Sequence, residues 1–394
     1  MAVLGRELIG RGHRVTFFGF PDMAPRLPPG CAFQAVGERD QPLGSLEPYL
    51  QRLSRLGGPL SYWTFIHDLA GFTDVICRDL PGILNRLAPD ALIIDQTDAA
   101  SSLVATALGV PFVNVANALP LNLEPAVPPP VLPWPYDPSS KGLRRNRGGY
   151  RVARLVERPI TRVIRRHARR FGRPEIRFAD DTWSQRLQIT QCVRGLDFPR
   201  VRLPATFHYV GPFREADASL DFDLPADGKP VIFCSLGTLQ GSRAKLFQAV
   251  AGAAADLDVT LVIAHGGLLP ESEIARLPGR PIVRSYVPQR ALLSSCALAV
   301  THAGFNTVID ALSFGVPMVA LPIAFEQPAT GARLERAGAA VVVHRRRTQA
   351  RIGEALRAVL TGRTYRANAG RLAAEIAGAG GVKRAACLVE QILP

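Results

Sequence analysis

Small and polar residues cluster at the ends of apolar runs in the second half of the chain. The first run, VIFC, is followed by Ser235, Gly237 and Thr238 at the start of a turn that leads into a helix. Backbone N–H groups at such a turn can donate hydrogen bonds to phosphate oxygens. Many strand-to-helix turns contain Gly and Ser, so this pattern alone indicates a phosphate site only weakly.

A second cluster follows the apolar run ALAV, in the stretch THAGFNTVIDALSFG. His302 and Gly304 come directly after the run, and Asn306 and Thr307 are placed to cap the helix that carries Asp310. A histidine at a helix N-terminus, beside a glycine that permits close backbone approach, predicts an anion site.

A third cluster, in LPIAFEQP, places Glu326 and Gln327 after another apolar run. These side chains suit hydrogen bonding to hydroxyls, although an ordinary solvated loop has the same composition. The three clusters occur in one half of the chain in this order, with SYVPQ before the second. This combination supports a ligand site more strongly than any one cluster does.

The elements that carry these residues predict two α/β halves. Strands are expected at 14–18, 91–94, 111–115 and 187–190, and a new alternation of apolar runs and helices begins near residue 230. Buried runs that alternate with helices indicate parallel sheets covered on both faces, which bind ligands at the carboxyl ends of their strands. We therefore expect an amino-terminal domain, a polar linker, and a carboxy-terminal domain that ends in helices: 1–212, 213–229 and 230–394.

The beginning of the chain predicts a helix that leads directly into the strand at 14–18. This is the second half of a βαβ unit, without a strand ahead of the helix. In a doubly wound sheet the first strand is central, and its loss would leave internal strand edges without partners. We therefore expect the natural protein to begin upstream of Met1.

Composition restricts the class of protein. The six cysteines are scattered without CxxC spacing, which favours free thiols in a reducing cytosol over disulfides or zinc. No apolar run approaches the ~20 residues that span a bilayer, and no signal peptide is recognisable. Asp221 and Asp223, the one metal-like pair, lie in the expected linker and are interpreted as solvated.

The positive charge is concentrated in one segment. Residues 141–177 hold fourteen Lys or Arg and two Glu, which is +12 of the net +14. Apolar residues such as Val152, Leu155 and Ile164 follow helical spacing within it, so a basic amphipathic helix is expected. Such a helix either packs its apolar stripe on the domain or lies on an anionic membrane surface. No binding motif or aromatic interleaving supports nucleic acid.

The stretch from SYVPQ to EQPATGARL resembles the nucleotide-sugar signature of UDP-dependent glycosyltransferases with the GT-B fold. CSLGTLQG and ALPLNLEPAVPPP further resemble the bacterial branch that includes zeaxanthin glucosyltransferase. The resemblance implies two Rossmann-like domains that face each other across a cleft. It also implies a cytoplasmic hexosyltransferase that needs neither a metal nor a cofactor, because the UDP-sugar is a co-substrate.

The resemblance assigns roles to the motif residues. Tyr286 and Val287 would hold the uracil, and Gln289 would meet the base or ribose. Asp310 would bind the ribose hydroxyls, where many relatives have Glu. Glu326 and Gln327 would bind the sugar, where relatives usually have Asp-Gln, so the identity of the sugar stays open. The diphosphate would contact several residues around two turns: Ser235, Gly237, Thr238, His302, Gly304, Asn306 and Thr307.

Inverting members of the family use a histidine base oriented by an aspartate. Asp95, at the end of ALIID, matches the aspartate, with Asp98 as its rival. The histidine would lie ahead of the first helix in a run resembling HxxPM, which would end at Met1. His13 and His67 are interpreted as structural.

These considerations predict an inverting transferase that moves a hexose, in the first place glucose, to a lipophilic hydroxyl such as that of zeaxanthin. Peripheral attachment to the inner face of the membrane through the basic segment is the alternative to its packing on the domain. The alternative is a UDP-sugar-binding protein that does not turn over because its base is missing. A GT-B epimerase or lipid-intermediate transferase is a weaker third hypothesis.

Overall fold

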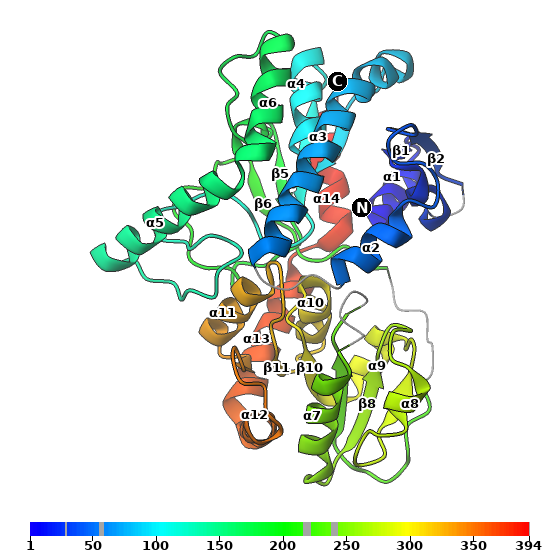
Figure 1. Ribbon diagram of the computed structural model, residues 1–394, viewed down its shortest axis with the longest axis vertical. Coiled ribbons are helices and arrows are strands. Elements are labelled where there is room, and N and C mark those ends of the chain that lie inside the picture. The colour runs from blue at the N-terminus through cyan, green and yellow to red at the C-terminus, as the bar shows by residue number, and fades with distance from the viewer. Residues whose placement is uncertain (28–29, 55–58, 216–221, 238–242, 394) are drawn as a thin grey trace.

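The computed structural model describes residues 1–27, 30–54, 59–215, 222–237 and 243–393, apart from the side chains of 54 and 59–62. Figure 1 shows two lobes, one above the other. All paired strands in the described residues are parallel and lie in three sheets. Two α/β lobes of parallel sheets confirm the predicted fold class.

The four strands predicted in the first lobe are present, with ends that shift by up to two residues, whereas the strands Ala32–Ala35 and Phe207–Tyr209 were not predicted. Its strands are β1 Thr16–Gly19, β2 Ala32–Ala35, β3 Leu92–Asp95, β4 Phe112–Ala116, β5 Gln188–Thr190 and β6 Phe207–Tyr209. Its helices are α1 Ala2–Gly10, α2 Leu46–Ser54, α3 Pro59–Leu87, α4 Ala99–Leu108, α5 Ser140–Val156 and α6 Arg158–Arg170, with 3-10 helices Pro21–Arg26 and Ala179–Thr182.

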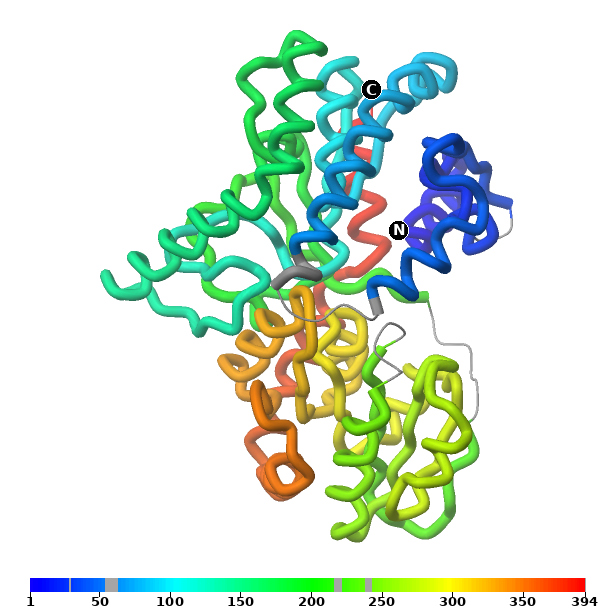
Figure 2. The backbone as a smooth tube through the Cα atoms, in the orientation of Figure 1, coloured from blue at the N-terminus to red at the C-terminus, as the bar shows by residue number. Residues whose placement is uncertain are grey.

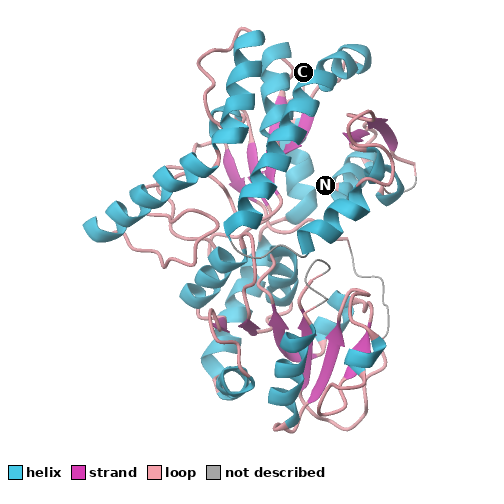
Figure 3. Cartoon of the chain, in the orientation of Figure 1, coloured by secondary structure: helices cyan, strands magenta, loops and turns pink. Residues whose placement is uncertain are grey.

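The second lobe contains one six-stranded sheet, drawn as magenta arrows in the lower half of Figure 3. Its strands are β7 Val231–Ser235, β8 Thr260–Ala264, β9 Ile282–Arg284, β10 Cys296–Thr301, β11 Met318–Ala320 and β12 Ala340–Val342. Its helices are α7 Ala244–Ala255, α8 Glu271–Ile274, α9 Gln289–Ser294, α10 Phe305–Ser313, α11 Gln327–Ala337, α12 Gln349–Thr361 and α13 Arg363–Gly378.

The strand order of this sheet, β12-β11-β10-β7-β8-β9, is that of the doubly wound dinucleotide-binding fold. The order reverses between β7 and β10, which are paired with a register shift between Cys296 and Leu298. In such sheets ligands bind at the carboxyl ends of the strands on either side of the reversal. The fold therefore directs attention to Ser235 and Thr301, the last residues of β7 and β10.

The first lobe has two sheets instead of one. β1 pairs with β2, β3 begins a separate sheet of order β3-β4-β5-β6, and β1 and β3 are not paired with each other. Helix α3 covers both sheets on one face, because its Leu80, Ile83 and Leu84 pack with Leu92 and Phe18. Within the described residues, one edge of β1 and one edge of β3 thus lack a partner strand.

The last helix, α14 Gly381–Glu390, returns to the first lobe. Figure 2 shows this carboxy-terminal segment beside the amino-terminal one. Ala385, Ala386 and Val389 are buried with Leu4 and Leu8 of α1 in one apolar cluster. The first lobe therefore folds around both ends of the chain.

The basic segment forms two helices where one was predicted. α5 ends at Val156 and α6 begins at Arg158, because Pro159 in the first turn of α6 cannot continue the preceding helix. The expected apolar stripe divides in the same way: Ile164 of α6 is fully buried, whereas Val152 and Leu155 of α5 are 59% and 52% exposed. Helix α5 projects from the body of the lobe in Figure 1.

Among the described helices, none combines the length and the apolar character needed to cross a bilayer.

Candidate active site

A cavity of about 500 Å³ lies where the two lobes meet. The first lobe supplies Asn117 and Ala118 after β4, and the second lobe supplies the remaining lining residues. The cavity is at the carboxyl ends of β7 and β10, where the strand order predicts a ligand.

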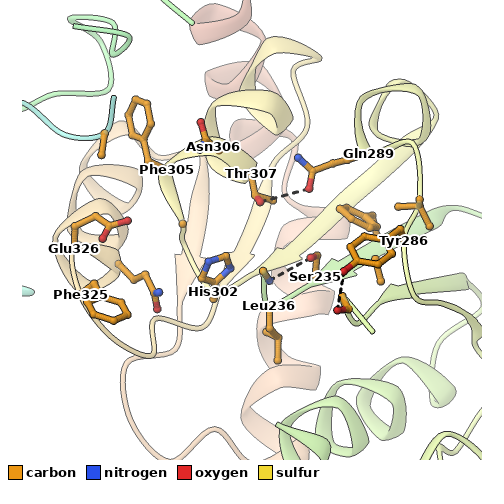
Figure 4. Close-up of a pocket in the computed structure, with 18 of the residues that line it drawn as sticks. Ser235, Leu236, Tyr286, Gln289, His302, Phe305, Asn306, Thr307, Phe325 and Glu326 are labelled. Carbon is orange, nitrogen blue, oxygen red and sulfur yellow. Dashed lines mark hydrogen bonds between the residues drawn. The ribbon is translucent and has the colours of Figure 1, made fainter. Parts of the chain in front are cut away.

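Most of the motif residues line this one cavity, as Figure 4 shows for the labelled ones. Thr238 lies outside the described residues, while Asp310 and Asp95 lie beside the cavity without lining it. The predicted residues in the lining are Ser235, Gly237, Tyr286, Val287, Gln289, His302, Gly304, Asn306, Thr307, Glu326 and Gln327.

Two glycines make room for the His302 ring. A Cβ atom at Gly304 would lie 2.3 Å from Nε2 of His302, and one at Gly237 would lie 2.7 Å from its Cε1. Gly237 also has a φ of +75°, which favours glycine. The turns after β7 and β10 therefore both approach the Nε2–Cε1 edge of the imidazole, at distances that no side chain would allow.

The His302 ring is partly buried, and its desolvation keeps it neutral. Desolvation lowers the pKa of His302 to about 4, against a small opposing effect of the Ser235 backbone. Its Nδ1 is buried without a hydrogen-bond partner among the described residues. A neutral imidazole carries one N–H and can donate a single hydrogen bond to a ligand in the cavity.

The N-terminus of α10 is not capped by a side chain. Gly304 is the N-cap residue, and Asn306 and Thr307 lie inside the helix, so the prediction that these two residues cap it is wrong. Their side chains bond to Arg214 and Gln289 instead. Gly304 therefore offers no side-chain acceptor to the first N–H groups of α10, as at helix N-termini that bind anions, while the Glu326 carboxyl lies near the N–H of Phe305.

Asp310 receives hydrogen bonds from three side chains. Arg214 donates from Nε to Oδ1 over 2.6 Å, and Gln289 donates from Nε2 to Oδ2 over 2.8 Å. Arg290 lies farther away, with Nη1 at 3.4 Å from Oδ1. Asp310 is 6% exposed, and its Oδ2 is bonded to Gln289, which lines the cavity.

Tyr286 provides an aromatic wall on the far side of the cavity. Its ring is 70% exposed, and its hydroxyl donates to the Gly266 carbonyl over 3.1 Å. Val287 packs against the apolar core of the second lobe. An exposed, anchored ring of this kind offers a flat apolar surface for stacking.

Glu326 and Gln327 form the opposite wall together with Phe325. Burial raises the pKa of the Glu326 carboxyl above its ordinary value. Oε1 of Gln327 accepts from the backbone N–H groups of Ile323 and Ala324, each over 2.8 Å, which leaves its amide group to donate. Phe325 has a φ of +55° and contacts the Phe65 ring of the first lobe at a centroid distance of 5.6 Å.

Asp95 and Asp98 differ in their surroundings. Asp98 is the N-cap of α4 and accepts from the N–H and hydroxyl of Ser101, and burial raises its pKa. Asp95 accepts from Thr97 and from the amide of Asn117, which lines the cavity. The geometry thus connects Asp95 to the cavity and gives Asp98 a structural task.

None of the seven histidines is hydrogen-bonded to Asp95 in the part of the chain that the structure describes. His13 pairs with Glu390 of α14 at 3.2 Å, and His67 bonds to the Trp63 carbonyl at 2.9 Å. Neither His13 nor His67 lines the cavity.

The structure shows no metal site at the pair Asp221 and Asp223 within the described residues. Asp221 lies outside the described residues, so its relation to Asp223 is not seen. Within the described ranges, no three His, Cys, Asp or Glu side chains are grouped as metal ligands.

Sequence reasoning missed Asn117, Arg214 and Phe325. Asn117 comes two residues after the strand predicted at 111–115, so its place near a strand's carboxyl end is a signal that was available. Arg214 was included in the linker, and only its contact with α10 reveals a role. The residue type of Phe325 gives no signal that it lines the cavity, because its side chain is placed there by a left-handed backbone conformation.

A family model described as UDP-glucoronosyl and UDP-glucosyl transferase matches residues 170–376. The chain is 38% identical to a zeaxanthin glucosyltransferase of Pantoea ananas over 99% of this chain and 92% of the relative. It is 39% identical to a zeaxanthin glucosyltransferase of Pseudescherichia vulneris over 99% and 94% of the two chains.

Solved structures agree on the fold. The calicheamicin glycosyltransferase CalG4 aligns with a TM-score of 0.76 at 23% identity, over 100% of this chain and 94% of CalG4. The glycosyltransferase VinC in complex with dTDP aligns with a TM-score of 0.69 at 20% identity, over 100% and 95%. The two lobes, the strand order and the cavity between them thus define a GT-B glycosyltransferase. The chain belongs to the UDP-glucuronosyl and UDP-glucosyl transferase family.

Proposed function

We propose that the protein transfers glucose from UDP-glucose to a hydroxyl of a lipophilic acceptor, with zeaxanthin as the first candidate. The observation that carries this proposal is the full-length similarity to two zeaxanthin glucosyltransferases. The interlobe cavity supports it, because it joins an exposed aromatic ring, an uncapped helix N-terminus and a pair of hydroxyl-binding side chains.

The donor would lie across the cavity. The uracil stacks on Tyr286, the diphosphate contacts the first turn of α10 and the neutral ring of His302, and the ribose faces Asp310. The hexose reaches Glu326 and the amide of Gln327. Ser235 and Gly237, with Thr238 as expected from the sequence, would complete the phosphate-binding turn.

The proposed chemistry inverts the anomeric carbon and uses no metal. A base takes the proton of the acceptor hydroxyl, whose oxygen attacks the anomeric carbon as the bond to the diphosphate oxygen breaks. The electron pair leaves with UDP, and the helix N-terminus and the His302 hydrogen bond stabilise the charge. Asp95 would orient the base, which none of the described histidines supplies.

The alternative is a protein that binds UDP-glucose without turnover. The absence of a histidine beside Asp95 in the described residues favours it. Incubation with UDP-glucose and zeaxanthin, followed by mass spectrometry, separates the two proposals. Transfer gives zeaxanthin with one or two added hexoses, and β-carotene, which has no hydroxyl, gives none. UDP-glucose binding without any hexosylated product would support the alternative.

We further propose that α5 holds the enzyme at the inner face of the membrane, where a carotenoid dissolves. Val152 and Leu155 are exposed side by side on α5, and the nearby exposed cations are Arg144, Arg147, Arg151 and Arg158. Apolar residues among arginines suit an anionic bilayer surface.

Vesicle flotation tests this attachment. The protein should float with phosphatidylglycerol vesicles, and Val152→Glu with Leu155→Glu should abolish flotation. The matched control is Leu43→Glu with Val201→Glu, which changes two apolar residues that are 71% and 85% exposed elsewhere. Equal flotation of both double variants would exclude α5 as the anchor.

A further inference from the structure

Arg214 joins the end of the first lobe to the donor side of the cavity. It follows β6 by five residues, and its guanidinium reaches α10 in the second lobe, where Nε donates to Asp310 and Nη2 donates to Oδ1 of Asn306 over 3.0 Å. One planar fork thus holds two residues one helical turn apart. A lysine, with a single ammonium, cannot reproduce this geometry.

The backbone around Arg214 is fixed by the first lobe. The N–H of Phe213 donates to Oε1 of Gln191 over 2.9 Å, and Nε2 of Gln191 donates to Asn117 over 2.6 Å. Asn117 lines the cavity and bonds to Asp95. Hydrogen bonds therefore connect Asp95 of the first lobe to the backbone of Phe213, and the next residue, Arg214, bonds to Asp310 of the second.

The contacts of Asp310 leave one oxygen with spare capacity. Among the described residues, Oδ1 faces the cations of Arg214 and Arg290, whereas Oδ2 receives a single hydrogen bond, from Gln289. A carboxylate oxygen accepts about two hydrogen bonds. With Oδ1 held by Arg214, Oδ2 is the oxygen that can accept from a hydroxyl of a bound nucleotide.

We propose that Arg214 is a positioning residue that fixes the Asp310 carboxylate for the ribose 2′-hydroxyl, and so selects ribonucleotide over 2′-deoxyribonucleotide donors. This inference rests on the proposed function, because it requires a nucleotide in the cavity. The fold itself does not select the sugar, since the similar glycosyltransferase VinC was solved with dTDP. Selection between ribose and deoxyribose must therefore come from local contacts. A fixed acceptor that bonds to the 2′-hydroxyl strongly favours the nucleotide that carries this hydroxyl over the one that lacks it.

Calorimetric titration with UDP and with 2′-deoxy-UDP tests the inference on the full chain. The wild type should prefer UDP by about tenfold. Arg214→Ala should weaken UDP binding by about tenfold and change 2′-deoxy-UDP binding by no more than about twofold, so that the preference disappears. Arg214→Lys should lose most of the preference as well, since it keeps the charge without the fork.

The control is Arg6→Ala, which removes a neighbouring arginine whose partner is Glu215. This variant should keep the wild-type preference. A merely structural role of Arg214 would lower the melting temperature and weaken both nucleotides equally, which would overturn the inference.

Two further results would overturn it: equal affinities of the wild type for UDP and 2′-deoxy-UDP, or a preserved preference in a folded Arg214→Lys variant. If Arg214→Ala does not fold, the lysine variant decides the matter. No binding of either nucleotide to the wild type would instead refute the proposed donor site, so the two failures are distinguishable.

Discussion

The amide of Asn117 donates a hydrogen bond to Oδ2 of Asp95 while Asn117 itself lines the interlobe cavity. Asp95 ends β3 and Asn117 comes directly after β4, and these strands are neighbours. The carboxyl ends of adjacent parallel strands meet at one edge of a sheet, which is why the two side chains come together. This contact distinguishes Asp95 from Asp98.

Replacing Asp95 should affect catalysis without affecting donor binding. We expect Asp95→Asn to lower the rate of glucosyl transfer by about 100-fold, because an amide cannot stabilise a cationic base. The affinity for UDP should stay unchanged, since Asp95 does not line the cavity. Steady-state kinetics and UDP titration measure the two effects.

The matched control for this prediction is Asp98→Ala. Loss of the α4 N-cap should cost about 1–2 kcal/mol of stability, measured by urea unfolding, with normal turnover of the folded protein. A larger loss of rate in the folded Asp98 variant than in the Asp95 variant would reverse the assignment.

The glycines around His302 should not tolerate alanine. Gly304→Ala would place a Cβ 2.3 Å from the ring and force it toward the cavity, so UDP binding should weaken at least about tenfold. Gly370→Ala is the control, because a Cβ there meets nothing within 4 Å. This exposed helical change should leave binding unaltered and should stabilise the protein by about 0.5–1 kcal/mol. Equal UDP affinity of both variants would show that the ring does not contact the nucleotide.

His302 should make stability depend on pH. Burial lowers its folded-state pKa to about 4 from an ordinary value near 6.5, so the unfolded chain binds a proton more readily. The neutral ring therefore contributes no penalty above pH 6.5, and stability falls as the pH drops from 6.5 toward 4, by about 3 kcal/mol in all. Urea unfolding at pH 7 and pH 4.5 should show a smaller decrease for His302→Gln than for the wild type. An identical decrease would contradict the burial of this ring.

A buried ion pair between the lobes should be essential for stability. Asp197 of the first lobe bonds to Arg333 of α11 over 2.9 Å and to Arg200 over 2.8 Å, and all three are about 1% exposed or less at their side chains. Burial alone would raise the pKa of Asp197, but the two guanidinium groups hold it below its ordinary value.

Removing Asp197 leaves two buried cations with backbone carbonyl acceptors but without the carboxylate they share, so Asp197→Ala should cost about 3–5 kcal/mol. Asp68→Ala removes the acid of an exposed pair with Arg52 and should cost less than about 1 kcal/mol. Thermal unfolding followed by circular dichroism compares the two. Similar losses in both variants would show that the lobes do not depend on the Asp197 cluster.

Much of the second lobe could be predicted from the sequence, because its strands are buried apolar runs and its ligand residues follow them directly. The cavity therefore brought together residues from three separate motifs. The prediction that Asn306 and Thr307 cap α10 was wrong, because the N-cap residue is Gly304, which gives no local sequence signal. The side chains of Asn306 and Thr307 bond to Arg214 and Gln289 instead.

The first lobe was harder to predict. The break between α5 and α6 depends on Pro159. The regular apolar spacing around this proline led to the prediction of one continuous helix. The role of Arg214 depends on its contact with Asp310 in the other lobe, 96 residues later in the chain. No local sequence pattern indicates such a contact.

The most direct test of the donor site is a crystal structure of the protein with bound UDP. The account predicts the uracil on Tyr286, the diphosphate between His302 and the first turn of α10, and the ribose beside Asp310. A nucleotide bound elsewhere, or a diphosphate turned away from α10, would contradict it.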